Sequence, residues 1–135
     1  MIEELYHNQD LIAIIIKANY KKEGIHFFTN QDSFQQVGYM NREEGYKIEP
    51  HFHLPSNRIV TKTQEVLFIK SGKVQISFFD NDLKFLENKI VTTGDVIFLS
   101  SGGHGFLMLE KSEIIEVKQG PYLKEDDKLR LKLNL

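Results

Sequence analysis

Short runs of β-branched and aromatic residues, separated by turn residues, recur along the whole of this chain. Such side chains lose rotamer freedom on a helix and pack well on a pleated sheet. The Ile-rich run LIAIII, residues 11–16, therefore predicts a buried strand. Similar runs at 25–29, 34–40 and 65–79 predict further strands, and residues 81–100 hold more of them. The pattern as a whole predicts an all-β domain, either a sandwich or a barrel.

The length of 135 residues suits one domain, and neither a repeat nor a long linker divides it. We expect a single domain over residues 1–135, with 1–10 and 123–135 as peripheral arms. The first ten residues are polar and leave three possibilities open: a short helix, a disordered arm, or a strand passed to a partner.

Composition narrows the classes of partner. The formal charge of −2 provides no electrostatic footprint for nucleic acid or for an acidic membrane. No apolar run approaches the ~20 residues of a membrane span, and the acidic start differs from a secretion signal. We therefore expect a cytoplasmic protein with neither nucleic acid nor membrane as partner. The chain has no cysteine, so any metal must bind through nitrogen and oxygen.

Residues 45–72 contain the first candidate site. The segment YKIEPHFH alternates in character, so His51 and His53 would face the same side of a strand. Glu65 opens the next apolar run, and we expect residues 65–79 to form a hairpin that turns at 70–73.

A further histidine, His104, follows a glycine-rich turn in the segment GDVIFLSSGGHGF. Three imidazoles and one carboxylate from separate β-segments suit Fe, Mn, Ni, Co, Cu or Zn, with positions left open for water or substrate. Spacing does not choose among these metals. We therefore predict a divalent transition metal held by His51, His53, Glu65 and His104.

The same residues resemble the two conserved motifs of the cupin superfamily. Gly45, His51, His53, Glu65 and Gly72 match elements of the first motif, G-x5-H-x-H-x3-4-E-x6-G. The second motif, G-x5-P-x-G-x2-H-x3-N, is similar to the stretch that contains Gly94, Gly102 and His104. The resemblance implies a single cupin-type jelly roll, also called a double-stranded β-helix, and the same four metal ligands.

The match has departures. Eleven residues separate His53 from Glu65 where the motif has three or four, although the spacing to Gly72 favours a lengthened loop with Glu65 in place. Ser100 stands at the motif's Pro, His104 comes one residue early, and Met108 lies close to the motif's Asn. Two other readings stay open: a His104 that only hydrogen-bonds in a corner, and a Glu65 that is a solvated strand-end charge.

Substrate-binding candidates come from the neighbours of these ligands. Glu49 lies two residues before His51 and is the one candidate for a general base; no catalytic residue is otherwise identified. Arg58 lies in the long loop, where it could grip an anionic group. Phe106 and Tyr39 could line the cup, with plain core packing as the alternative.

Three functions follow. The first is a metalloenzyme for a small polar molecule, for instance an isomerase, an epimerase or an oxygenase. The second is a non-catalytic sugar-binding or sensory module, and the third is an accessory subunit. The segment EIIEVKQGPY resembles one in small cupins found among polysaccharide biosynthesis genes, which implies a carbohydrate or sugar-nucleotide ligand. We also expect a homodimer, because an Ile-rich strand at a sheet edge needs cover.

Overall fold

The structure is a computed structural model that describes residues 1–123 and 128–131. The described residues form ten β-strands and no helix, which confirms the all-β class. The strands are β1 (Ile2–His7), β2 (Asp10–Ile16), β3 (Gly24–Phe27), β4 (Gly38–Asn41), β5 (Glu65–Ser71), β6 (Lys73–Phe79), β7 (Phe85–Thr92), β8 (Val96–Leu99), β9 (Gly103–Met108) and β10 (Glu113–Lys118).

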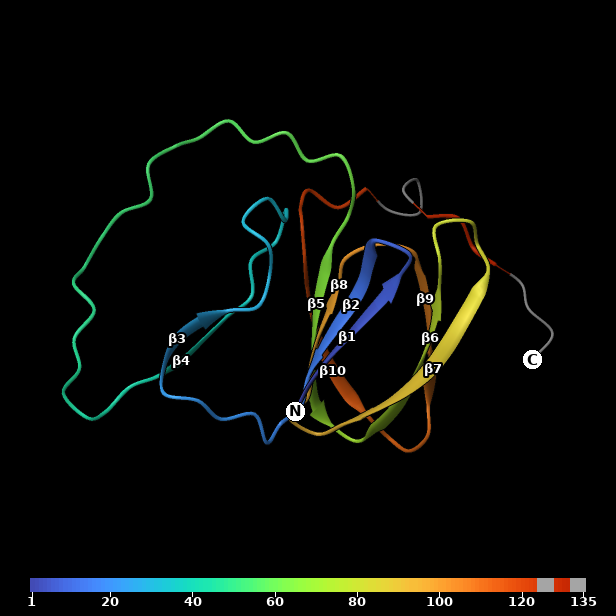
Figure 1. The fold of residues 1–135 in the computed structure, drawn as a ribbon, viewed down its shortest axis with the longest axis horizontal. Helices are drawn as coiled ribbons and strands as arrows, with labels where there is room; N and C mark the ends of the chain where they lie inside the picture. Colours follow the sequence, from blue (N-terminus) through green and yellow to red (C-terminus); the bar gives the residue numbers. More distant parts are fainter. Residues whose placement is uncertain (124–127, 132–135) are drawn as a thin grey trace.

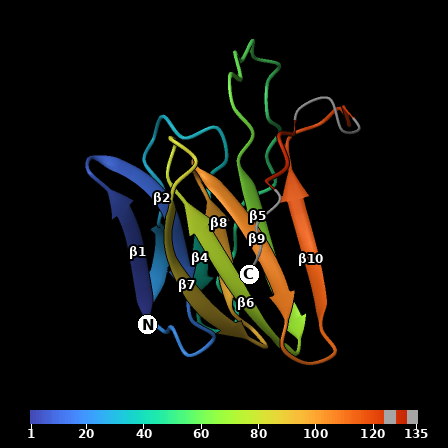
Figure 2. The same cartoon turned by 90° about the vertical axis from the view of Figure 1, so that its right-hand side faces the viewer.

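Two of the three sheets face each other. The larger sheet has five strands in the order β1-β2-β8-β5-β10, and the smaller has three in the order β7-β6-β9. Every pairing in both sheets is antiparallel. Figures 1 and 2 show the two sheets as layers, with β3 and β4 apart from them on the outer side of the five-stranded sheet.

From β5 onward the chain passes repeatedly between the two sheets. β5, β8 and β10 belong to the five-stranded sheet, whereas β6, β7 and β9 belong to the three-stranded sheet. The hairpin predicted over residues 65–79 is therefore wrong, because β5 pairs with β8 and β10 while β6 pairs with β7 and β9. The turn at Gly72 connects the two sheets.

Gly72 makes this crossing possible. Its φ of +103° lies in the left-handed half of backbone space, and a Cβ there would lie 2.6 Å from the Lys111 carbonyl oxygen. Only glycine meets both requirements without strain. The Gly72 amide also donates to the Thr93 hydroxyl at 3.0 Å, which ties this crossing to the turn between β7 and β8.

The first residues form β1, which pairs with β2 through a turn at Asn8 and Gln9. Of the three possibilities for residues 1–10, a strand is found, and it pairs within its own chain. The Ile-rich strand β2 therefore lies between β1 and β8 and is not an edge. The expectation of a homodimer was based on an Ile-rich strand at a sheet edge, and this reason is wrong because β2 is not an edge strand.

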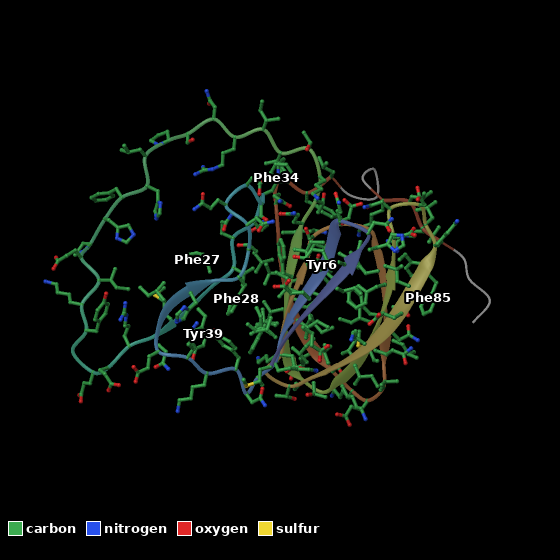
Figure 3. All side chains as sticks on the ribbon, viewed as in Figure 1. Tyr6, Phe27, Phe28, Phe34, Tyr39 and Phe85 are labelled. Carbon is green, nitrogen blue, oxygen red and sulfur yellow. The ribbon has the colours of Figure 1, made fainter. Side chains whose placement is uncertain are left out.

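The β3–β4 pair covers the outer face of the five-stranded sheet. Ile14, Ile16 and Phe98 of that sheet pack there against a layer that includes Tyr20, Phe28 and Val37. Tyr20 also makes edge-to-face contacts with Phe28 and with Tyr39 of β4. Figure 3 shows Phe28 between the β3–β4 segment and the sheet.

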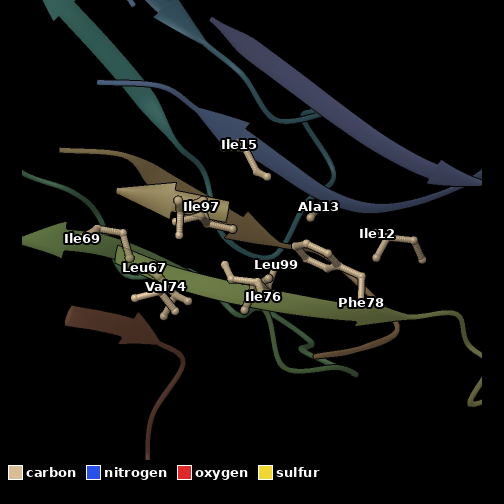
Figure 4. Close-up of a cluster of buried hydrophobic side chains, with 11 residues drawn as sticks. Ile12, Ala13, Ile15, Leu67, Ile69, Val74, Ile76, Phe78, Ile97 and Leu99 are labelled. Carbon is tan, nitrogen blue, oxygen red and sulfur yellow. The ribbon is translucent and has the colours of Figure 1, made fainter. Parts of the chain in front are cut away.

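The main core lies between the two facing sheets. Ile69 and Leu67 from β5 meet Ile76 and Phe78 from β6, all at most 2% exposed. Figure 4 shows these side chains converging from both layers, with Ile97 and Leu99 beside them. The alternation of β5 is as predicted, since Glu65, Leu67 and Ile69 share the face toward this core.

Residues 42–64, here called the arm, connect β4 to β5 without a strand of their own. The prediction that His51 and His53 lie on a strand is wrong for this chain taken alone. A strand needs a neighbour for its backbone hydrogen bonds, and no backbone–backbone bond of residues 47–62 is found in the part of the chain that the structure describes. Figure 1 shows the arm as a wide loop that leaves the sheets.

The predicted terminal arm at 123–135 falls largely on residues 124–127 and 132–135, which lie outside the described residues. Over the described residues, no helix is long and apolar enough to cross a membrane.

Candidate functional site

Glu65 and His104 meet between the two facing sheets. Glu65 is the first residue of β5 and His104 is the second residue of β9, so they come from opposite layers. His104 Nε2 lies 3.2 Å from Glu65 Oε2. The glutamate side chain is 12% exposed and the histidine side chain 29% exposed, so the pair is shielded but remains accessible.

The strand register explains why these two side chains face each other. His104 lies opposite Phe78 of β6, and directly opposed residues of an antiparallel pair share a face. Phe78 belongs to the core between the sheets, so His104 faces inward as well. Glu65 shares its face with the core residue Leu67. The pair therefore lies at the end of the apolar core.

Buried Gln64 fixes the start of β5 and with it the position of Glu65. Its side chain is 2% exposed. Its amide Oε1 accepts from the Gln35 backbone N–H at 3.0 Å, and its Nε2 donates to the carbonyl and hydroxyl oxygens of Ser100 at 3.3 Å. Its backbone N–H donates to Gln119 Oε1 at 2.9 Å. These bonds connect β5 to the ends of β8 and β10.

The surroundings of Glu65 favour its charged form. The hydrogen bond from His104 lowers the pKa of this carboxyl below its ordinary value of 4.5, and burial opposes the change. The charge of His104, a contact with Glu116 and the charge of Lys118 lower the pKa further. Glu65 is therefore a carboxylate at neutral pH, the form that binds a cation.

His51 and His53 lie together on the arm. Their ring centroids are 5.3 Å apart, and His51 Nδ1 lies 2.9 Å from the Glu49 carbonyl oxygen. Both residues are exposed. Within the described residues, no three side chains of His, Asp or Glu are grouped so that they could hold a metal ion. The structure thus brings together two pairs of the four predicted ligands, but not all four in one chain.

Two of the predicted substrate-binding residues also lie on the arm. Glu49 is exposed, and its carboxylate lies 3.6 Å from Lys47 Nζ. Arg58 lines an open hollow of about 510 Å³, together with residues of the 31–36 turn. Neither residue is placed at the Glu65–His104 pair.

The two predicted aromatic residues differ in position. Phe106 lies on β9 opposite the core residue Ile76, faces inward like His104, and has its ring 5.4 Å from the His104 ring. It is 41% exposed and forms a wall beside the pair. Tyr39 instead packs on Tyr20 at 4.9 Å in the outer layer, so core packing describes it better.

Sequence reasoning missed the residues that hold or neighbour this pair. A buried Gln64 has no local signature, because glutamine is common on surfaces. Lys118 lies opposite Glu65 in the β10–β5 register, and its Nζ lies 3.4 Å from Glu116 on the same strand. The available signal is the segment EIIEVKQGPY, whose alternation places Glu116 and Lys118 on one strand face, where they could pair with each other.

The Glu65–His104 geometry fits two neighbouring ligands of one metal ion. Ligand atoms bound at ~2.1 Å and separated by 90–109° lie roughly 3.0–3.4 Å apart. The observed 3.2 Å separation falls in this range. The nitrogen and carboxylate donors also suit a borderline divalent metal. The pair comprises two of the four predicted ligands.

No family model matches this chain, and no curated protein or solved structure is similar enough to match it. The cupin resemblance therefore stays a prediction from the motif residues.

Proposed function

We propose that this chain is a cupin-type jelly-roll protein that binds a divalent transition metal and, beside it, a small polar molecule. The single observation that carries the proposal is the 3.2 Å approach of His104 to Glu65 from opposite sheets. A buried carboxylate that stays charged and an imidazole at the spacing of two metal ligands form a site suited to a cation.

The strand order supports the jelly-roll part of the proposal. From β5 to β10 the chain crosses four times between two facing antiparallel sheets, with β6 and β7 as neighbours in one of them, which is compatible with a double-sheet jelly roll. The sheets do not close into a barrel, because β9 and β10 have no second neighbouring strand among the described residues. The space between these two strands is the mouth of the cup.

The residues around the pair support a polar ligand. Phe106 provides an apolar wall, whereas Glu116 and Lys118 provide charged groups on the inner side of β10. A mixture of one aromatic wall and a few polar groups is typical of sites for small molecules. A carbohydrate or sugar nucleotide fits this chemistry, and the EIIEVKQGPY resemblance points in the same direction.

In this proposal Glu65 and His104 hold the metal, and His51 and His53 complete the ligand set when the arm reaches the site. When bound, such a metal polarises a carbonyl or hydroxyl oxygen of the ligand. Gln64 keeps Glu65 in place, and Phe106 excludes water from one side. Binding is the proposed activity, and turnover is the alternative that the second experiment tests.

The first experiment measures metal content. Wild-type protein loaded with Zn, Mn, Ni or Fe and then desalted should carry about one metal per chain by elemental mass spectrometry. His104→Ala and Glu65→Gln should each weaken binding by at least about 100-fold. His26→Ala is the matched control, because His26 lies on β3 away from the pair, and it should keep the metal. Full metal content in a Glu65→Gln/His104→Ala protein would sink the proposal.

The second experiment separates binding from turnover. Sugars, sugar nucleotides and small acids are screened by thermal shift, with and without metal, since a ligand that binds the native state raises its stability. Stabilising ligands are then incubated with the metal-loaded protein and examined for conversion. Stabilisation without conversion identifies a binding module, and conversion identifies an isomerase, an epimerase or an oxygenase.

A further inference from the structure

Within the described part of the chain, the two facing sheets have edge strands on both sides, β1 with β7 on one side and β9 with β10 on the other. Among the described residues, β9 pairs only with β6, and β10 pairs only with β5. The outer backbone edges of both strands thus have no strand beside them. Figure 2 shows these two edges next to each other. We call this pair of edges the open side.

Apolar side chains are exposed along the open side. Phe106 and Met108 of β9 face the inside of the cup and are 41% and 48% exposed. Leu107 of β9 and Val117 of β10 lie on the outer faces and are 56% and 52% exposed. An exposed edge with apolar residues on both faces invites pairing with another strand.

The arm has the pattern of the missing strands. Between residues 46 and 54 the apolar residues Tyr46, Ile48, Phe52 and Leu54 alternate with Lys47, Glu49, His51 and His53. Such alternation is typical of a strand with one polar and one apolar face. Phe52 is 95% exposed and Leu54 is 83% exposed. A loop of this length without structure of its own is uncommon in a compact domain.

We propose that the arm of one chain adds as strands to the open side of a second copy, and that the second copy returns its arm in the same way. The exchange is closed and two-fold symmetric, as most homodimers are. With the polar face of the arm turned inward, His51 and His53 enter the partner's cup beside its Glu65–His104 pair. The histidine part rests on the proposed function, whereas the strand exchange does not.

The position of the arm favours a second copy over its own chain. The preceding β3–β4 pair is fixed on the outer face of the five-stranded sheet, away from β9. Figure 1 shows the arm leaving on the side opposite to β9. The arm is held at both ends, by β4 and by β5, so its middle could reach roughly 35–40 Å from these strands, enough to cross to a neighbouring molecule.

The polarity of the arm and the polarity of the open side agree with this exchange. With the histidines inward, Phe52 and Leu54 face outward beside Leu107, so the added strand extends an apolar face that the two subunits can bury together. Gln119 Nε2 at the end of β10 is buried and has no acceptor among the described residues. An added strand on β10 would bring backbone carbonyls to this region.

The first test uses mixed dimers. A His51→Ala/His53→Ala chain and a Glu65→Gln/His104→Ala chain carry different tags, are unfolded and refolded together, and are purified on both tags. Exchange predicts one intact site per mixed dimer, so it should bind Zn at about half the wild-type content per chain. Each variant alone should bind none. Mixed dimers without Zn, beside a wild type that binds it, would overturn the exchange.

The second test does not depend on metal. The natural chain has no cysteine, so a Phe52→Cys/Leu107→Cys chain has only the two introduced thiols. A flexible bismaleimide should produce covalent dimers on a denaturing gel, and light scattering should give twice the 15.7 kDa chain mass. A Phe52→Cys/Phe85→Cys chain, with Phe85 on β7, is the matched control and should cross-link much less.

The outcomes separate the two proposals. Cross-links within single chains, or a monomer at micromolar concentration, mean that the arm folds back on its own β9 and β10 or stays free, and would overturn the exchange. Covalent dimers of the Phe52→Cys/Leu107→Cys chain, together with a wild type that binds no metal, keep the exchange and reject the metal site.

Discussion

The two sides of the facing sheets, the one between β1 and β7 and the one between β9 and β10, end in different ways. On the first side, here called the closed side, Lys89 of β7 lies 3.3 Å from Glu3 of β1 and 3.1 Å from Glu87. A charged contact thus joins β1 and β7 where the two layers meet, although Tyr6 of β1 and Ile90 of β7 are exposed there as well. On the open side the border residues include Phe106, Leu107 and Val117.

The difference between the two sides bears on which edge another strand could join. Charged side chains on an edge strand discourage pairing with another chain, whereas apolar ones encourage it. The closed side is thus bridged by an ion pair, and the open side is where the proposed exchange would continue the sheets. Since Glu65 and His104 lie at the open side, the proposed ligand site and the proposed surface for the arm are the same region.

The largest expected effect comes from weakening the core that both sides share. Phe78 is fully buried between the sheets. Phe78→Ala should lower the free energy of unfolding by about 3–5 kcal/mol, because it removes a buried ring and leaves a cavity. Urea unfolding at one fixed protein concentration measures this loss in the free energy of unfolding. The control is Phe85→Ala on the closed side, where the ring is 54% exposed and the loss should be much smaller. Equal losses would contradict the described core.

The next effect is specific to the open side. Gln64→Ala removes the bonds to Gln35 and Ser100 and leaves buried groups without partners. We expect a loss of about 1–3 kcal/mol in the free energy of unfolding. Gln9→Ala, in the exposed turn between β1 and β2, should change it little. If metal binding is measured as well, Gln64→Ala should weaken it through the displaced Glu65, and unchanged affinity would show that Gln64 has no positioning role.

The free energy of unfolding of the wild type and of Glu65→Gln, measured over a range of pH, tests the contribution of the Glu65 carboxylate at the open side. Its pKa is lowered in the folded state, so its contribution is present above the unfolded value and is lost as the pH falls through the folded pKa. Glu65→Gln should therefore cost on the order of 1 kcal/mol at neutral pH. The difference between the two proteins should vanish at acid pH, below the folded pKa. A constant difference across the series would show that the ion pair is not its source.

The smallest effect belongs to the closed side. The contacts with Glu87 and Glu3 raise the pKa of Lys89, so its contribution is present below the unfolded pKa and is lost only at strongly alkaline pH. Because Lys89 is 33% exposed, Lys89→Ala should cost less than about 1 kcal/mol, and added salt should reduce that cost. Unfolding curves at low and high salt test this. A large, salt-independent loss would indicate that the closed side depends on packing instead.

The strands could be predicted from the sequence because their signals are local. The Ile-rich run of β2 and the alternation of Glu65, Leu67 and Ile69 state which residues face inward without reference to the rest of the chain. The partners of a strand are not local. The turn at Gly72 resembles a hairpin turn in sequence, yet β5 and β6 lie in different sheets.

The candidate site was predictable to the extent that it depends on residue type. Glu65 and His104 are predicted as metal ligands because of their residue types and their positions in the motifs. The structure brings the two side chains within 3.2 Å of each other. Alternation also predicted a strand around His51 and His53, but alternation states only that a segment suits a sheet edge. It does not state where that edge is, and within the described residues 47–62 of the arm pair with no strand.

The repeated passage of the backbone between the two sheets has a mechanical consequence. Since the chain from β5 to β10 crosses repeatedly between the layers, neither layer can be peeled away while the other stays whole. Loss of order should spread through both layers at once, and assembly should be slow, because strands distant along the chain must meet before any layer is complete.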